Sequence, residues 1–400
     1  STQRLRNAPV SMAKLRWPPK LSKARVTMRA PAARAMSSVA SVLPESTTRM
    51  SSLHATLLSE RASRGDDRVR RSPRMHWDGG GIAEPDLVVA SLGELGYLQQ
   101  NGINPDEVLY SNTVKPPTHV AAAYDAGVWR FAFDSEGELH KLARHAPGSA
   151  VIVRLRVDDS GSTFPLSRKF GTELDSARDL MVLARNLGLR PYGVTFHVGS
   201  QCATPVAWRQ AIAASGRLMT DLTAVGIQLE MLNLGGGFPA RYVDPVPTID
   251  AIAEVILSSI NELLPYRPRT IVAEPGRYLV AESAVLVAGV LGREIRAGEH
   301  WLYLDTGAYH GLMETQQTVG QWKYPLWSSR PDHAQAGQLP YTVTGPSCDS
   351  NDTMFHAAML PSAVDVDDRL YIGSAGAYTL SYASHFNGFA PPIAAYVGER

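Results

Sequence analysis

From residue 87 onward, a short apolar run that ends in small or polar residues recurs along the chain, and each run is followed by a stretch with helical periodicity. This alternation is typical of βα units, whose strands form a parallel sheet. The apolar runs are residues 87–91, 108–111, 131–135, 151–156, 192–198, 229–234 and 270–274. Amphipathic stretches at 173–187 and 204–225 separate later runs. We therefore predict an α/β fold of the (β/α)8 TIM-like barrel type.

A closed barrel of this type needs eight strands, so one βα unit would have to lie before residue 87. Its strand should be a near-continuous apolar run, and residues 61–74 are too charged for that. The only apolar pieces there are residues 26–28 and 38–43. We therefore expect the first βα unit to be atypical or missing.

After Pro275 the pattern changes to strands without intervening helices. The expected strands are residues 278–287, 301–304, 338–343 and 369–372, followed by a final segment rich in Gly, Ser and aromatic residues. This pattern favours a mostly β second domain. We predict a basic N-terminal segment over 1–86, a barrel over 87–277 and a C-terminal β domain over 278–400.

The charge is unevenly distributed along the chain. Residues 1–86 hold 16 Lys and Arg against 7 Asp and Glu, whereas residues 87–400 hold 23 against 31. The first 44 residues contain no acid and are dominated by Arg, Ser, Ala and Pro, a composition that resembles an organellar transit peptide. The alternatives are a disordered basic tail, or a segment foreign to the rest through a frame error or an altered exon. Few aromatic residues and no recognisable fold argue against nucleic-acid binding.

No stretch approaches the roughly eighteen consecutive apolar residues of a membrane-spanning helix. The only cysteines are Cys202 and Cys348, which makes a disulfide framework implausible and favours a reducing compartment. We expect a cytoplasmic protein without a membrane association or a metal site, with organellar targeting by residues 1–44 as the alternative.

Polar residues follow the ends of the predicted strands, where the functional groups of such a barrel lie. The glycine run Gly235–Gly237 would offer backbone N–H groups to a phosphate, and Ser200 and Arg277 follow neighbouring strands. The carboxylate of Glu274 would keep a pyridine nitrogen protonated, and the imidazole of His197 would stack on such a ring. Each residue alone is more often structural, and a tight turn explains a glycine triplet equally well, so the argument depends on the whole set.

Six motifs occur in order along the chain. They are His197-Val-Gly-Ser-Gln201, Leu232-Asn-Leu-Gly-Gly-Gly-Phe-Pro239, Glu274-Pro-Gly-Arg277, Gly345-Pro-Ser-Cys-Asp-Ser350, Gly376-Ala-Tyr-Thr379 and Phe386-Asn-Gly-Phe389. Over about residues 87–400 this set resembles the group IV, fold-type III pyridoxal-phosphate (PLP) decarboxylases of the ornithine or lysine/ornithine type. The resemblance implies PLP as the cofactor and a homodimer with an active site shared across the interface.

The resemblance also implies roles for individual residues. Glu274 would pair with the pyridine nitrogen, and His197 would stack on the ring. Across the dimer interface, Cys348 would give a proton to the carbon that loses carbon dioxide, and Asp349 would bind the distal amine of the substrate. The residues implied to contact the phosphate are Ser200, Gly235, Gly236, Gly237, Gly276, Arg277 and Tyr378, while Glu94 and Arg154 would lie near the cofactor.

Asp349 is the residue that separates substrates. The Cys-Asp-Ser form of residues 348–350 resembles ornithine and lysine/ornithine decarboxylases, whereas diaminopimelate decarboxylases typically show Cys-Glu-Ser. A single carboxylate suits a terminal ammonium. We predict decarboxylation of ornithine to putrescine, a step of polyamine biosynthesis, with lysine and diaminopimelate as alternative substrates. Glu314 is a second acid considered near the amine, and we expect it to be structural.

Two other classes of PLP-binding barrel are alternatives to this resemblance. Alanine racemase-like barrels share the cofactor, and PLP-carrier barrels share it without a second domain. The β domain with Cys348-Asp349 and the Phe386-Asn-Gly-Phe389 motif argues against both classes.

The chain departs from the family pattern at the lysine that carries the cofactor. Extending the match upstream without gaps places this lysine in residues 65–74, which contain none. The lysines before residue 87 are Lys14, Lys20 and Lys23, and none follows a strand-like run. Lys115 ends a predicted strand, but the family carries there a lysine that is not the attachment site. Val88 also replaces an acid that is usual in the family.

Three interpretations follow from the missing lysine. The chain is a decarboxylase with an unusual N-terminus, a catalytically inactive homologue, or a defective gene product in which residues 1–86 are not family sequence. For the chain as written we expect poor turnover.

Overall fold

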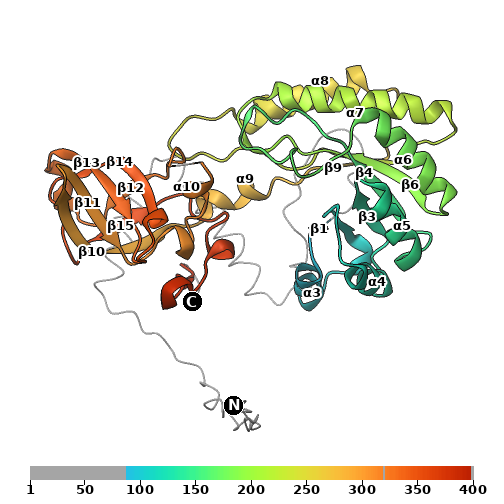
Figure 1. The fold of residues 1–400 in the computed structure, drawn as a ribbon. Coiled ribbons are helices and arrows are strands. Elements are labelled where there is room, and N and C mark those ends of the chain that lie inside the picture. Colours follow the sequence, from blue (N-terminus) through green and yellow to red (C-terminus); the bar gives the residue numbers. More distant parts are fainter. Residues whose placement is uncertain (1–86, 319, 398–400) are drawn as a thin grey trace, which may run out of the picture. The chain divides into compact units, whose positions relative to one another are not determined.

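The computed structural model describes residues 87–318 and 320–397, and within them a parallel sheet confirms the predicted α/β fold of the barrel type (Figure 1). The strand order is β1-β2-β3-β4-β6-β8-β9. The strands are β1 (Leu87–Val89), β2 (Val108–Tyr110), β3 (Arg130–Phe133), β4 (Ala150–Arg154), β6 (Arg190–Thr195), β8 (Met231–Asn233) and β9 (Thr270–Val272). Each lies within a predicted apolar run or within two residues of it. The segments considered for a further strand, 26–28, 38–43 and 61–74, lie outside the described residues.

A helix follows most strands of this sheet. The helices are α3 (Leu92–Gln100), α4 (Pro117–Asp125), α5 (Glu136–His145), α6 (Leu174–Asn186), α7 (Val206–Ala224) and α8 (Ile249–Leu263). Three of them begin at a side-chain cap, since Ser91, Ser135 and Thr248 each accept the backbone N–H of the residue three places on. Such caps satisfy a helix N–H that has no partner within the helix. The predicted helical periodicity after residues 229–234 carried no bounds, and α8 supplies them.

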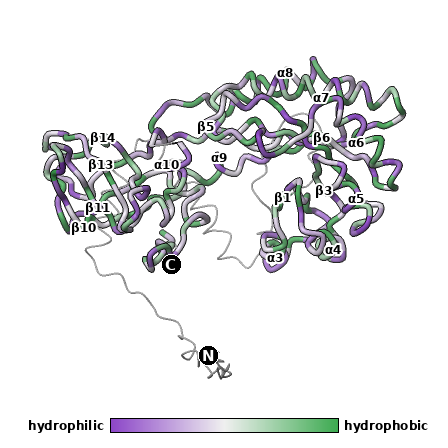
Figure 2. Tube along the Cα trace, in the orientation of Figure 1, coloured by the Kyte–Doolittle hydropathy of each residue, from purple (hydrophilic) through white to green (hydrophobic). Residues whose placement is uncertain are grey.

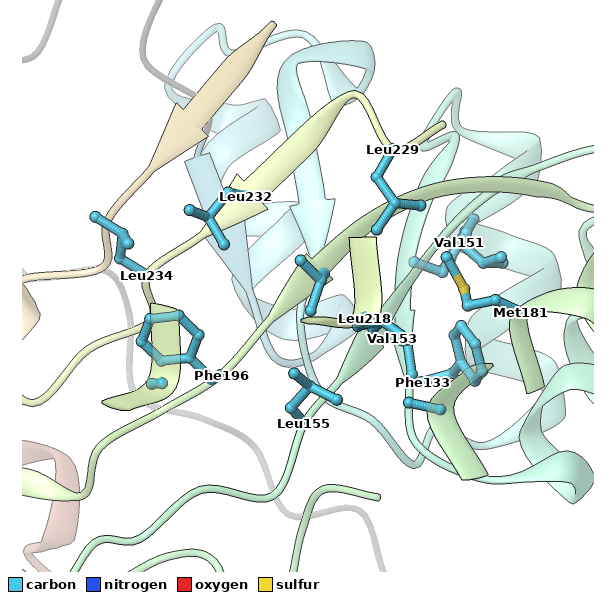
Figure 3. Close-up of a cluster of buried hydrophobic side chains, with 14 of the residues drawn as sticks. Phe133, Val151, Val153, Leu155, Met181, Phe196, Leu218, Leu229, Leu232 and Leu234 are labelled. Carbon is cyan, nitrogen blue, oxygen red and sulfur yellow. The ribbon is translucent and has the colours of Figure 1, made fainter. Parts of the chain in front are cut away.

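Side chains alternate along each strand, so the continuous apolar runs make both faces of the sheet apolar. On β4, Val151 and Val153 join a large buried cluster with the helices, together with Phe133 and Met181 (Figure 3). Ile152 instead belongs to a separate small cluster on the opposite face. Colouring by hydropathy shows apolar segments in both the strands and the helices (Figure 2). Burial on both faces is what a barrel strand requires.

The second part of the chain forms a six-stranded sheet, in agreement with the predicted β domain. Its order is β12-β15-β10-β11-β13-β14, antiparallel except for the parallel pair β11–β13. The strands are β10 (Leu286–Arg296), β11 (Glu299–Leu304), β12 (Leu326–Ser328), β13 (Gln338–Thr344), β14 (Thr353–Pro361) and β15 (Arg369–Ile372). The cluster inside it also includes Phe164, Ala240 and Tyr242 from the first part of the chain.

One expected strand is partly wrong. The segment predicted as a strand over 278–287 begins as helix α9 (Gly276–Val280), continues as a 3-10 turn (Ala281–Ser283), and becomes extended only at β10. The helix forms because Leu279 donates to the carbonyl of Pro275 at 3.1 Å and because Arg277 turns inward to a buried partner. A boundary at residue 277 therefore falls within α9, and the division into domains there stays a prediction.

Shorter elements lie between these strands and helices. Strands β5 (Ser162–Phe164) and β7 (Ser200–Cys202) pair with each other, and α10 (Glu314–Gln317) follows β11. Besides the 3-10 turn Ala281–Ser283, the described 3-10 helices are Pro105–Glu107, Ala308–His310, Pro331–Gln335, Ser350–Asp352, Leu380–Tyr382 and Phe386–Gly388. The described part of the final Gly-, Ser- and aromatic-rich segment thus forms turns, not a strand. None of the helices described is long and apolar enough to cross a membrane.

Candidate active site

Four polar side chains continue the inner face of the first sheet beyond its carboxyl edge. The inner-face cluster includes Leu109, Ile152, Met231 and Val272. The residues two places further along these strands are Ser111, Arg154, Asn233 and Glu274. Because side chains alternate with a period of two, this spacing directs the polar groups to the mouth of the barrel.

Glu274 is held by one of its two oxygens. Its Oε1 accepts from Asn233 Nδ2 at 2.7 Å and from Ser111 Oγ at 3.3 Å. Its Oε2 has no hydrogen-bond partner among the residues that the structure describes. Burial raises the pKa of the Glu274 carboxyl, and the bonds from Asn233 and Ser111 and the charge of Arg154 oppose that rise. The carboxylate is thus oriented, with one oxygen ready for a cationic or N–H ligand.

The ring of His197 is fixed in one tautomer. Gly199 N–H donates to His197 Nδ1 at 3.0 Å, so Nδ1 is an acceptor and a neutral ring carries its proton on Nε2. Burial and the nearby Arg154 charge lower the pKa of His197 to about 4. A Cβ placed on Gly236 would lie 2.8 Å from His197 Nε2 and 2.9 Å from the Glu274 carbonyl oxygen. This one point brings His197, the glycine turn and Glu274 together.

The turn over residues 235–237 requires glycine for packing. Gly235 has φ +62°, and a Cβ there would lie 1.9 Å from the carbonyl oxygen of Phe196. A Cβ on Gly237, with φ +99°, would lie 2.2 Å from the carbonyl oxygen of Gly199. Since both backbone conformations and both contacts exclude a side chain, the turn packs directly against the loop after β6.

Arg277 is buried at the centre of a polar network. Its Nε donates to Ser200 Oγ at 3.2 Å, its Nη1 donates to Tyr242 Oη and to Glu314 Oε2 at 2.9 Å each, and its Nη2 donates to Glu314 Oε1. Its guanidinium also lies 4.6 Å from the ring centroid of Tyr378. Burial alone would lower the pKa of Arg277, but the Glu314 carboxylate outweighs it and the pKa is raised. Arg277 is therefore permanently charged.

The two residues predicted near the cofactor, Glu94 and Arg154, differ in their contacts. Glu94 Oε2 accepts from Ala90 N at 2.6 Å, while Ser91 Oγ accepts from Glu94 N at 3.2 Å. This reciprocal pair caps helix α3. Arg154 lies 5.1 Å from the ring centroid of Phe170, and burial lowers its pKa. Arg154 thus joins the group around Glu274, whereas the contacts of Glu94 are those of a helix cap.

Cys348 and Asp349 lie in a second cluster, which belongs to the β domain. Asp349 Oδ2 accepts from Tyr309 Oη at 2.7 Å, and Oδ1 accepts from Asn351 N at 2.9 Å. These two hydrogen bonds lower the pKa of Asp349, and the bond from Asn351 has the larger effect. The exposed thiol of Cys348 lies 3.6 Å from Asn387 Oδ1. The cluster therefore presents an ionised carboxylate beside a free thiol.

Comparison with known proteins agrees with this geometry. A family model described as "Pyridoxal-dependent decarboxylase, pyridoxal binding domain" matches residues 85–281. A lysine/ornithine decarboxylase from Selenomonas ruminantium is 34% identical over 311 residues, which cover 76% of each chain. The chain belongs to the pyridoxal-dependent decarboxylase family. The predicted resemblance and the PLP cofactor are thereby confirmed.

Two further members of the family differ in what their names state. The arginine decarboxylase of Paramecium bursaria Chlorella virus has a solved structure with a TM-score of 0.70 and 30% identity, over 76% of this chain and 80% of that one. Antizyme inhibitor 2 from Xenopus laevis is 31% identical over 78% of this chain and 70% of its own length. The family thus includes proteins whose names state different substrates, and one that is named an inhibitor.

The described residues fit the pyridine nitrogen and the phosphate of PLP. Glu274 Oε2 suits the ring N–H, and the neutral ring of His197 would stack on the pyridine. Ser200 and Arg277, next to the glycine turn, suit the phosphate. The lysine expected to hold the aldehyde carbon is not among the residues described, and residues 65–74, Lys14, Lys20 and Lys23 lie outside them.

The described lysines are placed elsewhere. Lys115 is buried, donates to the carbonyls of Asn112 and Ala132 at 2.8 and 2.7 Å, and pairs with Glu138 at 2.9 Å. Burial lowers the pKa of Lys115 to about 8. The other three described lysines are Lys141, Lys169 and Lys323. Lys141 pairs with Glu138, Lys169 lies over the ring of Phe170, and Lys323 is exposed. These contacts give Lys115 a structural role; that it is not the attachment site stays a prediction.

We expect Lys115→Met to lower the free energy of unfolding by about 1–3 kcal/mol, since Glu138 would keep only Lys141 as a partner. Urea denaturation at pH 7 measures this. The substitution should leave PLP binding unchanged. A loss of PLP binding without a loss of stability would contradict the structural role of Lys115.

Several residues of this site were not singled out from the sequence. Ser111 could have been found, because it lies two places after the inner-face residue Leu109. Tyr242 and Tyr309 had no such signal. Tyr242 lies in a loop and Tyr309 in the 3-10 helix Ala308–His310, and each contacts a partner more than thirty residues away in the chain. Glu314 was expected to be structural, and its contacts are with Arg277.

Proposed function

We propose that this chain is a PLP-dependent decarboxylase of a basic amino acid, and that L-ornithine is its substrate and putrescine its product. The observation that carries the proposal is Glu274, whose oriented carboxylate keeps one oxygen for the pyridine N–H. When bound, PLP accepts the electron pair that remains when carbon dioxide leaves. An ionised Glu274 holds a proton on the ring nitrogen and so favours that acceptance. The relatives named as lysine/ornithine and arginine decarboxylases support a basic substrate.

The Cys348 cluster supports the choice of ornithine. Asp349 stays ionised and is oriented by Tyr309, so it would bind a terminal ammonium by a charge-assisted hydrogen bond. Cys348, beside it, would return a proton to the carbon that lost carbon dioxide. We further propose that this cluster acts across the interface of a homodimer and that the protein works in the cytoplasm. Lysine and diaminopimelate remain the alternative substrates.

A second candidate is a catalytically inactive homologue. It is favoured by the lysines, since residues 65–74 contain none and Lys115 is held in an ion pair. Antizyme inhibitor 2 shows that a family relative can carry a name other than decarboxylase. In this case the chain would keep the contacts for PLP or for a partner without turnover.

The two candidates are separated by mapping the attachment site. The purified chain is mixed with PLP and reduced with borohydride, and mass spectrometry identifies the modified lysine, while release of carbon dioxide from ornithine, lysine and diaminopimelate is measured in parallel. Specific labelling of one lysine with release from ornithine supports the enzyme. Absence of both results supports the inactive homologue.

Asp349→Asn tests the substrate assignment. We expect kcat/KM for ornithine to fall about tenfold or more, because a hydrogen bond between two charged groups is lost. The dissociation constant of PLP should not change. Equal losses for ornithine and for an amino acid without a distal amine would contradict the role of Asp349.

A further inference from the structure

A buried ion pair links the proposed phosphate site to the β domain. Arg277 on α9 and Glu314 on α10 form a two-pronged contact, and their side chains are only 4% and 3% exposed. A carboxylate that accepts from both terminal nitrogens fixes the plane of the guanidinium as well as its position. Glu314 therefore determines how Arg277 is turned.

Aromatic groups close the space around this pair. Phe164, Tyr242, Trp322 and Tyr378 lie with their ring centroids 4.6–5.9 Å from the Arg277 guanidinium carbon. Tyr324 Oη donates to Glu314 Oε2 at 3.5 Å. Burial raises the pKa of Tyr242 to about 12, so its hydroxyl stays neutral. The surroundings thus leave Glu314 as the charged partner of Arg277 among the described residues.

Strand β7 connects the other end of Arg277 to the glycine turn. Its Nε donates to Ser200, the first residue of β7, and Cys202 of the same strand donates to the Gly237 carbonyl at 2.8 Å. Of the five N–H groups of an arginine, the described residues accept four, and the remaining one is on Nη2. Glu314 and Ser200 together therefore hold both ends of the guanidinium beside the turn.

We propose that Glu314 is a positioning residue for phosphate recognition, which fixes Arg277 in the orientation that meets the phosphate of PLP. This inference rests on the proposed function, since it requires Arg277 to contact that phosphate. A guanidinium that is already fixed loses little freedom when the phosphate binds. Without Glu314, the terminal nitrogens would turn towards other acceptors.

The test compares a ligand with and without the phosphate. Equilibrium dialysis of the full chain measures the dissociation constants of PLP and of pyridoxal for the wild type, Glu314→Ala and Glu314→Gln. Glu138→Gln is the matched control, because Glu138 is as buried as Glu314 and also forms a buried ion pair, in its case with Lys115. Thermal unfolding of each variant is recorded in parallel.

We expect Glu314→Ala to weaken PLP binding about tenfold or more and to leave pyridoxal binding unchanged. Glu314→Gln, which retains one acceptor oxygen and the side-chain shape, should show a smaller loss with the same selectivity, and it decides the matter if Glu314→Ala does not fold. Glu138→Gln should lower stability without changing the ratio of the two constants.

Two results would overturn the inference in distinguishable ways. If the wild type prefers PLP over pyridoxal and the Glu314 variants keep this preference, Glu314 does not position the phosphate contact and the proposed function stands. If the wild type binds PLP no better than pyridoxal, the proposed phosphate site is wrong, and the role of Glu314 falls with it.

Discussion

Gly235→Ala is expected to destabilise the chain by about 3 kcal/mol or more, or to prevent folding, because overpacking and a strained backbone each cost about 1–3 kcal/mol. The new Cβ would lie 1.9 Å from the Phe196 carbonyl oxygen, and the residue would need φ +62°. The carbonyl oxygen belongs to the backbone and cannot move aside as a flexible side chain would. Removing the overlap therefore requires a shift of the chain at the end of β6 or of the turn itself. Urea denaturation and the yield of soluble protein measure the effect.

Gly276→Ala is the matched control for this substitution. Gly276 also belongs to the proposed phosphate site, but a Cβ there meets no heavy atom within 4 Å. It is the first residue of helix α9, where alanine is a better helix former than glycine. We expect unchanged or higher stability, with weaker PLP binding if the phosphate lies against this residue. Native stability of Gly235→Ala would show that the turn does not pack as described.

The first part of the fold was predictable because its signal is local. Each buried strand is an apolar run of four to seven residues, and the parallel sheet follows from the alternation of such runs with amphipathic helices. The same alternation put His197, Asn233 and Glu274 at strand ends. A sequence pattern thus predicted a candidate site at these strand ends, although it could not show which oxygen of Glu274 is held.

Contacts between distant segments were not predictable in this way. The segment from Tyr278 to Val280 has the apolar composition of a strand, but it is helical, since Arg277 is drawn to Glu314 on α10. Such outcomes depend on tertiary partners that no local pattern encodes.

Acidification is expected to destabilise the cofactor-free chain through His197. The pKa of this ring is about 4 in the folded chain, against about 6.5 in an unfolded chain. Because the folded pKa is depressed, the unfolded state binds more protons between these values, and stability falls as the pH falls. The full contribution is present above about pH 6.5 and is lost towards pH 4, on the order of 3 kcal/mol in total.

Urea denaturation of the wild type and of His197→Gln at pH 7 and at intermediate acid pH isolates this contribution, since other groups titrate alike in both proteins. The wild type should lose more stability than the variant over the same interval. His140→Gln, a substitution on the exposed surface of α5, should behave as the wild type. The physical cause is that the ring stays neutral only while it is buried beside Arg154, with Nδ1 bound by the Gly199 N–H. Equal losses for the wild type and His197→Gln would mean that folding does not lower the pKa of this ring, and that the ring is not buried beside Arg154 as described.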